Sequence, residues 1–210
     1  MKITYGITCC NELVEVQRLL DQLLAQKRPQ DNIVVLVDNP GGEDDEMIST
    51  LYQYESHNHD HMTVWRSEFE GHFADWKNKL NSYCKGDYIF QIDADEYLHP
   101  DLIKDLPAIL ETNPDVEVFL VPRVNTVDGL RQEHIDKWGW HVNQDGWVNF
   151  PDFQWRVFKN APHIKWKNKV HESITGFTQY TYLPQQVEYS LFHPKGIEKQ
   201  EKQNNYYNTL

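Results

Sequence analysis

Three carboxylates stand within four residues in the segment Asp93-Ala94-Asp95-Glu96, directly after an apolar run at residues 88–92. Residues two apart on a strand project to the same face, so Asp93 and Asp95 can converge while Ala94 packs inward. Carboxylates crowded in this way either raise one another's pKa or bind a cation. Oxygen ligands suit Mg²⁺ or Mn²⁺, which usually share their coordination with a substrate phosphate. A bare D-x-D pattern could also be a solvated acidic loop. Here an apolar strand that we expect to be buried leads directly into the pattern, which favours a binding site.

The elements that would position these carboxylates alternate between short apolar strands and amphipathic helices. We expect strands at Ile3–Cys9 and at residues 33–37, 62–65, 88–92 and 116–121, and helices near residues 13–27, 47–52, 76–84 and 100–110. The continuous apolar run at 33–37 is typical of a strand buried on both faces of a parallel sheet. The pattern predicts an α/β fold with a mainly parallel central sheet and helices on both faces.

In an open parallel sheet, ligands bind beyond the carboxyl ends of the strands. Two further polar segments fall at such ends: Thr8-Cys9-Cys10-Asn11-Glu12 after the first strand and Asp38-Asn39 after the second. We expect both segments to lie beside Asp93 and Asp95. Asn11 is predicted to be the N-cap of the first helix, because a short side-chain amide can accept from a free backbone N–H there.

The regular alternation ends after the strand at 116–121. Residues 124–185 are interpreted as irregular loops and short strands, and they hold five of the seven tryptophans: Trp138, Trp140, Trp147, Trp155 and Trp166. These rings could pack in the core or could stack on sugar rings, and composition does not choose between the two. A polar helix at residues 196–208 then continues without a stop signal, which suggests the first domain of a longer protein.

Composition sets limits on the class of protein. The 210 residues are 40% hydrophobic and 25% charged, with a net charge of −12, as in a single globular domain. The acidic balance argues against nucleic acid as a partner, and no apolar run reaches the roughly 20 residues of a transmembrane helix. The three cysteines, Cys9, Cys10 and Cys84, fit no zinc or redox motif, so we expect reduced thiols and a cytoplasmic location.

Several of these segments resemble family 2 glycosyltransferases with the GT-A fold. In the first half the resembling segments are residues 7–12 (ITCCNE), 37–39 (VDN), 76–78 (WKN) and 86–96 (GDYIFQIDADE). In the second half they are residues 151–158 (PDFQWRVF), 170–172 (VHE) and 191–193 (LFH), which are similar to lipopolysaccharide-core glucosyltransferases. The short length and the open-ended helix also resemble the N-terminal glycosyltransferase domain of a large chlorella-virus protein, which would act in the host cytoplasm.

The resemblance implies a UDP-sugar as the donor and Mn²⁺ or Mg²⁺ as the cofactor. Thr8, Cys10 and Asp38 would line the nucleotide base, with Asp38 accepting from the N–H of the uracil ring. Cys10 stands where the family more often has Tyr, which removes a stacking partner for the base. The donor site would be completed by Cys9, Glu12 and Ala94.

The resemblance also implies roles near the phosphates and the reacting sugar. Lys77, at a position usually held by Arg, would lie near the diphosphate. Asp93 would hold the ribose or reach the metal through water, whereas Asp95 and His193 would bind the metal directly. Asp152 matches the catalytic aspartate of the family.

A carboxylate within reach of the acceptor hydroxyl can take its proton, and we predict Asp152 as this base, with Glu172 as the alternative. Burial in a Trp-lined pocket would raise the pKa of Asp152. Because no second carboxylate is clearly placed as a covalent nucleophile, we predict inversion at the anomeric carbon.

The prediction is therefore one GT-A domain over residues 1–210, in which residues 1–98 bind the donor and the metal and residues 99–210 form the acceptor side. It would move a hexose or deoxyhexose of the glucose or rhamnose type to a hydroxyl of a glycan, glycoprotein or glycolipid. A non-catalytic carbohydrate- or nucleotide-binding module remains an alternative. A nucleotidyltransferase on a similar sheet is another, although its Gly-rich basic loop is missing after the first strand.

Overall fold

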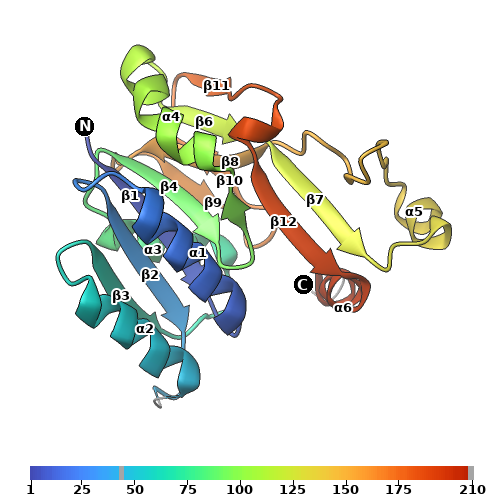
Figure 1. The fold of residues 1–210 in the computed structure, drawn as a ribbon, viewed down its shortest axis with the longest axis horizontal. Coiled ribbons are helices and arrows are strands. Elements are labelled where there is room, and N and C mark those ends of the chain that lie inside the picture. Colours follow the sequence, from blue (N-terminus) through green and yellow to red (C-terminus); the bar gives the residue numbers. More distant parts are fainter. Residues whose placement is uncertain (43–44, 208–210) are drawn as a thin grey trace.

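Seven strands form the central sheet of the computed structural model, which describes residues 1–42 and 45–207 (Figure 1). Their order across the sheet is β11-β6-β8-β4-β1-β2-β3. Among these strands β8 alone runs antiparallel to both of its neighbours, so the sheet is mainly parallel, as predicted. The strands are β1 (Ile3–Cys9), β2 (Asn32–Asp38), β3 (Met62–Ser67), β4 (Tyr88–Asp93), β6 (Val118–Val121), β8 (Gln154–Lys159) and β11 (Tyr180–Tyr182).

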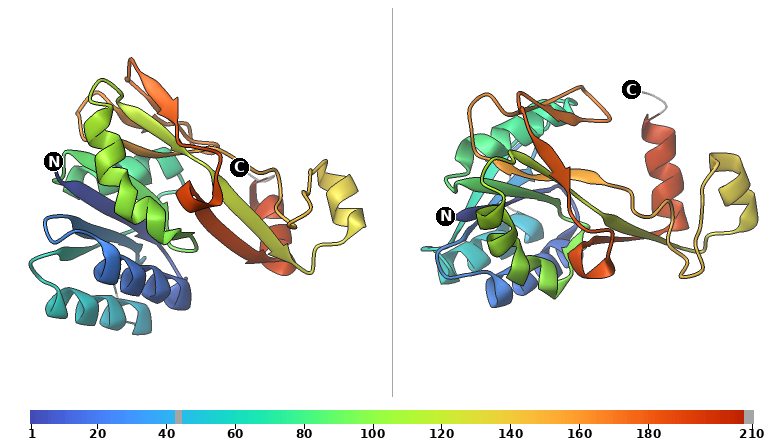
Figure 2. Two further views of the ribbon diagram at one scale, coloured as in Figure 1. Left: turned by 45° about the horizontal axis from the view of Figure 1, so that its top comes forward. Right: turned by 90° about the horizontal axis from the view of Figure 1, so that it is seen from above.

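Helices cover both faces of this sheet (Figure 2). The first face packs against α1 (Leu13–Gln26), α2 (Glu46–His57) and α4 (Pro100–Thr112), and the second against α3 (Phe73–Tyr83) and the hairpin of β9 (Lys165–Lys167) and β10 (Ser173–Thr175). The apolar run of β2 packs against both helix layers. Ile33, Val35 and Val37 face the first layer, and Val34 and Leu36 face the second. None of the helices in these described parts is long and apolar enough to cross a membrane.

A second, three-stranded sheet lies beside the central one, in the order β5-β12-β7 (Figure 1). In it β12 pairs in parallel with β7 and antiparallel with β5. The elements of this part of the molecule are β5 (Tyr97–Leu98), β7 (Arg123–Asp128), α5 (Gln132–Trp138), the 3₁₀ helix η1 (Val187–Tyr189), β12 (Leu191–Gly196) and α6 (Ile197–Tyr207). The small sheet brings residues of β7 and β12 to the carboxyl end of β4.

Residues 124–185 form loops and short strands, as expected, but they also contain the helix α5, and β8 fills the gap between β4 and β6 in the central sheet. One expectation about local structure is wrong. The N-cap of α1 is Glu12 rather than Asn11. The Glu12 carboxylate turns back and accepts from the backbone N–H groups of Cys10 at 2.9 Å and Asn11 at 3.1 Å, so the turn after β1 is held by a charged acceptor.

Candidate active site

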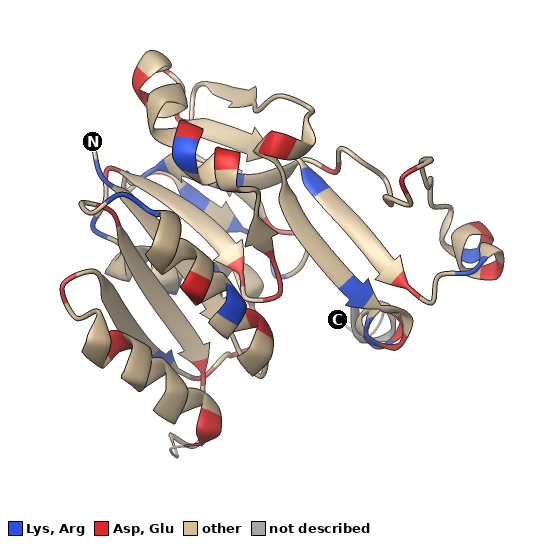
Figure 3. Cartoon of the chain, viewed as in Figure 1, with Lys and Arg blue, Asp and Glu red and all other residues tan. Residues whose placement is uncertain are grey.

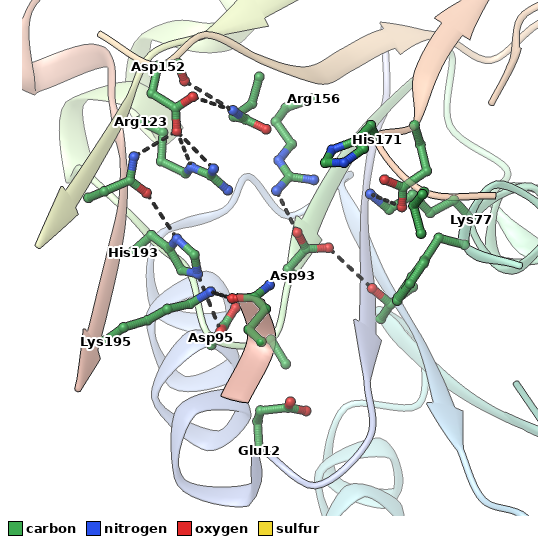
Figure 4. A pocket seen from close by; sticks show the side chains of 18 of the residues that line it. Glu12, Lys77, Asp93, Asp95, Arg123, Asp152, Arg156, His171, His193 and Lys195 are labelled. Atoms are coloured by element: carbon green, nitrogen blue, oxygen red, sulfur yellow. Dashed lines mark hydrogen bonds and ion pairs between the residues drawn. The ribbon is translucent and has the colours of Figure 1, made fainter. Parts of the chain in front are cut away.

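One cavity of about 720 Å³ opens at the carboxyl ends of β1, β2 and β4, and residues of α3, β7, β8, β9, β12 and α6 line its other walls (Figure 4). This volume is in the range of sites that enclose a ligand the size of a nucleotide sugar. Of the residues that the sequence singled out, twelve line it: Thr8, Cys9, Cys10, Glu12, Asp38, Lys77, Asp93, Ala94, Asp95, Asp152, Glu172 and His193. The fold thus gathers into one space side chains that are far apart in the chain.

The turns after β1 and β2 form one end of the cavity, which we call the nucleotide end. Hydrogen bonds fix the positions of its side chains. Asp38 accepts from the backbone N–H of Phe69 at 2.9 Å and from the thiol of Cys10 at 3.6 Å. Burial, together with the charges of Asp38 and Glu12, raises the pKa of Cys10 to about 11, so its thiol stays a neutral donor. Cys9 lies beneath this surface, where it is 5% exposed and packs in the core.

Asp95 and His193 meet in the middle of the cavity. The Nε2 atom of His193 lies 3.3 Å from Oδ2 of Asp95, and Nζ of Lys199 on α6 lies 3.3 Å from the same oxygen. Burial alone would raise the pKa of Asp95, but the hydrogen bond and charge of His193, aided by Lys195 and Lys199, hold it well below its usual range. Asp95 is therefore an anion in contact with a ring nitrogen.

This pair fits a divalent cation as part of a coordination shell. A carboxylate oxygen and an imidazole nitrogen are both ligands for Mn²⁺, and Mg²⁺ typically takes only one or two protein carboxylates, with water and substrate phosphates completing its shell. In the described parts of the chain, no group of three or more His, Cys, Asp or Glu side chains is placed to hold a metal ion. Further ligands would therefore have to come from water and from a bound diphosphate.

Glu96 does not join the other two carboxylates of its segment, contrary to the expectation of an acidic trio. Its side chain is fully buried and accepts from Arg156 at 2.7 Å and Arg123 at 3.1 Å. Arg156 donates at the same time to Asp93 at 2.6 Å. Burial would raise the pKa of Asp93, but the charges of Arg156 and Lys77 lower it far below the usual value. Asp93 is thus held by a guanidinium, and Glu96 is a structural anion beneath the site.

Asp152 lies at the opposite end from Glu12, which we call the base end (Figure 4). Its Oδ2 atom accepts from Arg123 at 2.8 and 3.0 Å and from Asn125 at 2.7 Å, and its Oδ1 atom accepts from Gln154 at 2.9 Å. The expectation of a raised pKa is wrong. Burial acts in that direction, but Arg123 and the donated hydrogen bonds of Asn125 and Gln154 outweigh it and lower the pKa of Asp152.

Lys77 and Glu172 form an ion pair on the wall between these ends. The Nζ atom of Lys77 lies 3.3 Å from Oε1 of Glu172 and 4.5 Å from the ring centroid of Trp166. Both charged side chains are largely buried, and Trp166 is 5% exposed. Trp166 is accordingly a core residue that also supports the lysine.

Arg123, Asn125 and Lys195 are among the polar residues of this cavity that were not singled out from the sequence. Arg123 and Asn125 are two apart on β7, and Asn125 links the site by donating to Asp152 through Nδ2 while its Oδ1 lies 3.0 Å from Nδ1 of His193. The polar-apolar-polar order of Arg123, Val124 and Asn125 is the strand signal that would have found them. Lys195 is two residues after His193 on β12, and burial lowers its pKa.

Comparison with known proteins adds two findings. The sequence matches the family described as glycosyl transferase family 2 over residues 4–181. The structure resembles S. aureus TarS at 15% identity and a TM-score of 0.63, covering 92% of this chain and 37% of TarS. Crystal structures of TarS 1–349 with UDP and with UDP-GlcNAc give the same identity and score and cover 92% and 93% of this chain. The likeness to TarS shows the fold, and a search of curated proteins returned no match.

The chain spans 37% of TarS and about 60% of TarS 1–349, so it corresponds to only part of either protein. The matched part contains the predicted α/β arrangement, a mostly parallel sheet between layers of helices.

Proposed function

The chain belongs to glycosyl transferase family 2, whose members are glycosyltransferases with the GT-A fold, and we propose that it uses a UDP-sugar as donor. It would transfer a hexose or deoxyhexose, of the glucose or rhamnose type, to a hydroxyl of a glycan, which is free or carried on a protein or lipid. The observation that supports this best is that one cavity has Asp38 at one end, Asp152 at the other and Asp95 between them.

The nucleotide end suits a uracil ring. The Asp38 carboxylate is anchored by Phe69 and Cys10 and retains lone pairs that can accept from the ring N–H of uracil. The S. aureus protein with the same fold has been crystallised with UDP and with UDP-GlcNAc, which supports the choice of donor class. Cytosine lacks that ring N–H, so an acceptor at this place favours uridine nucleotides.

Asp95 and His193 are the residues that would hold Mn²⁺ or Mg²⁺. The Nδ2 atom of Asn125 donates to Asp152, so its Oδ1 is free to accept from Nδ1 of His193, and this leaves Nε2 of the ring as the atom that faces Asp95. A bound divalent cation would supply positive charge where the departing diphosphate gains negative charge. Lys199 contacts Asp95, and its positively charged side chain could reorient to bind a phosphate.

Asp152 is the proposed base. Its Oδ2 atom already accepts three N–H bonds, whereas Oδ1 accepts one, from Gln154, so Oδ1 has room to accept the proton of an acceptor hydroxyl. The hydroxyl oxygen would bond to the anomeric carbon from the face opposite the diphosphate, and the bond from that carbon to the phosphate oxygen would break with its electrons leaving on UDP. This displacement inverts the anomeric centre. Glu172 is the alternative base, and it would first have to separate from Lys77.

A thermal-shift panel tests the donor assignment. UDP, UDP-glucose, GDP and CDP are each added with and without Mn²⁺, and a ligand at about 100 times its Kd should stabilise the fold by about 2.7 kcal/mol. We expect the uridine compounds to raise the melting temperature, and to do so strongly only with Mn²⁺. Asp95→Ala should remove the dependence on Mn²⁺. Asp115→Ala is the control, because Asp115 is exposed and lies outside the cavity lining.

Stabilisation by GDP or CDP instead of UDP would contradict the role of Asp38. An equal response with and without Mn²⁺ would contradict the role of Asp95.

A further inference from the structure

Five aromatic side chains form a continuous group at the outer edge of the central sheet, which we call the aromatic edge: Phe153, Trp155, Phe177, Tyr180 and Tyr182. Ring centroids are 4.6 Å apart between Phe153 and Tyr182, 5.6 Å between Trp155 and Phe177, and 5.8 Å between Tyr180 and Tyr182. Tyr180 also contacts Trp155 at 6.0 Å and Phe177 at 5.6 Å. The five rings are therefore linked by contacts from one end of the group to the other.

The sheet register explains why these rings meet. Strand β6 lies between β8 and β11, and Leu120 on β6 is paired with Tyr182 on one side and with Trp155 on the other. Paired residues point to the same face of a sheet, so Trp155, Leu120 and Tyr182 form one row. The row begins at the wall of the cavity, because Trp155 lines it, and ends at the free edge of β11 (Figure 1).

The outer end of this row is exposed. Tyr180 is 49% and Tyr182 51% exposed, and among the described residues they are two of only six large hydrophobic side chains that are exposed. Residues 173–187 contain no charged residue, although a quarter of the chain is charged, and Figure 3 shows β11 without blue or red. Proteins usually protect an edge strand with charges. An uncharged aromatic edge is therefore typical of an interaction surface.

The composition of this segment suits a neutral, hydroxyl-rich partner. Between and after the aromatic residues stand neutral hydrogen-bonding side chains: Gln179, Thr181, Gln185 and Gln186. Aromatic faces pack against the C–H groups of a sugar ring while such side chains bond to its hydroxyls. A second protein chain is a poorer fit, because the three residues of β11 offer few backbone groups for strand addition.

We propose that the aromatic edge binds the acceptor, a neutral oligosaccharide chain that runs from the cavity across Trp155 to Tyr180 and Tyr182. The inference rests on the proposed function, because it takes the cavity to be the place where the acceptor hydroxyl reacts. Phe153 and Trp155 flank Gln154, which contacts Asp152, so the row starts next to the proposed base. The hydroxyl at the end of the oligosaccharide would reach Asp152, and sugars farther along it would contact Tyr180 and Tyr182.

The experiment measures binding of neutral hexasaccharides by saturation-transfer NMR, with UDP and the diamagnetic ion Mg²⁺ present. The probes are maltohexaose, cellohexaose, laminarihexaose and mannohexaose, and at least one of them should bind the wild-type protein at about millimolar concentration. The double variant Tyr180→Ala/Tyr182→Ala should bind that hexasaccharide at least about tenfold more weakly. Tyr182→Leu alone, which keeps an apolar side chain at the edge, serves if the double variant has a lowered melting temperature.

Trp65→Ala is the matched control. Trp65 is 44% exposed on β3, at the opposite edge of the same sheet, so it tests whether any exposed aromatic side chain gives the effect. Its hexasaccharide binding should equal that of the wild type. Each protein is also tested for thermal stabilisation by UDP with Mn²⁺, which should be the same in all of them.

Three results would overturn this inference: no hexasaccharide binds the wild type, the double variant binds as well as the wild type, or gel filtration shows a dimer that the double variant dissociates. The last result would assign the aromatic edge to a second copy of the chain. Loss of the UDP response in the wild type would instead contradict the proposed function, so the two failures are distinguishable.

Discussion

The two ends of the cavity hold their polar groups in different ways. At the nucleotide end, the carboxylates of Asp38 and Glu12 accept from backbone N–H groups of neighbouring turns. At the base end, Asp152 and Glu96 are held by the guanidinium of Arg123, and most of this network is buried. Neutralising one member of a buried ion pair leaves its partner uncompensated, so substitutions should have larger effects at the base end than at the nucleotide end.

Asp152→Asn should have the largest effect on catalysis. The amide keeps the size of the side chain but cannot take a proton at Oδ1, so we expect kcat to fall by a factor of about 10²–10⁴ while UDP binding stays unchanged. The measurement is steady-state turnover together with UDP affinity. Glu172→Gln is the matched control and should retain most of its activity. Normal turnover by Asp152→Asn would place the base elsewhere, with Glu172 as the next candidate.

Glu96→Gln should give the largest loss of stability. Glu96 is fully buried between Arg123 and Arg156, and its neutralisation leaves two guanidinium groups with one fewer anion, so the free energy of unfolding should fall by about 3–5 kcal/mol. Denaturant unfolding measures this. Asp21→Asn, whose partner is the exposed Tyr54 hydroxyl, should change the same quantity by less than about 1 kcal/mol. Equal losses in the two variants would remove the distinction between a buried network and surface contacts.

Asp38→Asn tests the nucleotide end. Asparagine can still accept from Phe69, so the free energy of unfolding should change by less than about 1 kcal/mol. Its amide N–H groups would compete with the uracil N–H for the same place, and UDP should bind about tenfold more weakly. Isothermal titration with UDP and with CDP measures the effect. Unchanged UDP affinity would show that the base binds away from Asp38.

Gln154→Leu should produce the smallest change, in the pH profile of kcat/KM. The pKa of Asp152 is lowered by Arg123, Asn125 and Gln154, so the ionised base should persist into acidic solution in the wild type. Removing the donor to Oδ1 destabilises the anion and raises this pKa, and the acid limb should move to higher pH by less than about one unit. Gln53→Leu, on the exposed face of α2, should leave the limb in place. A shift to lower pH would contradict the assignment of Asp152.

The difference between the two ends also determines what the sequence could predict. The strands β1, β2 and β4 are rich in apolar and β-branched residues, and the polar residues that follow them had to lie at one edge of a parallel sheet. Asp38, Asp93 and Asp95 were therefore found from local pattern alone. The positions of Thr8 and Cys10 follow from the same rule.

The base end was harder to predict because its residues interact across long sequence separations. Arg123 pairs with Glu96, 27 residues earlier, and with Asp152, 29 residues later. The local sequence does not distinguish Glu96 from its acidic neighbours. Its side chain lies outside the cavity because it pairs with Arg156, whose position is set by the place of β8 in the central sheet. The same pairing lowers the pKa of Asp152, where burial alone would have raised it.

A crystal structure of the chain with Mn²⁺ and UDP would test the proposed donor site. We expect a cation in contact with Asp95 and His193, a diphosphate beside it, and the uracil ring against Asp38. A bound UDP whose ring lies away from Asp38, or crystals in which that corner holds no cation at saturating Mn²⁺ and UDP, would contradict this expectation.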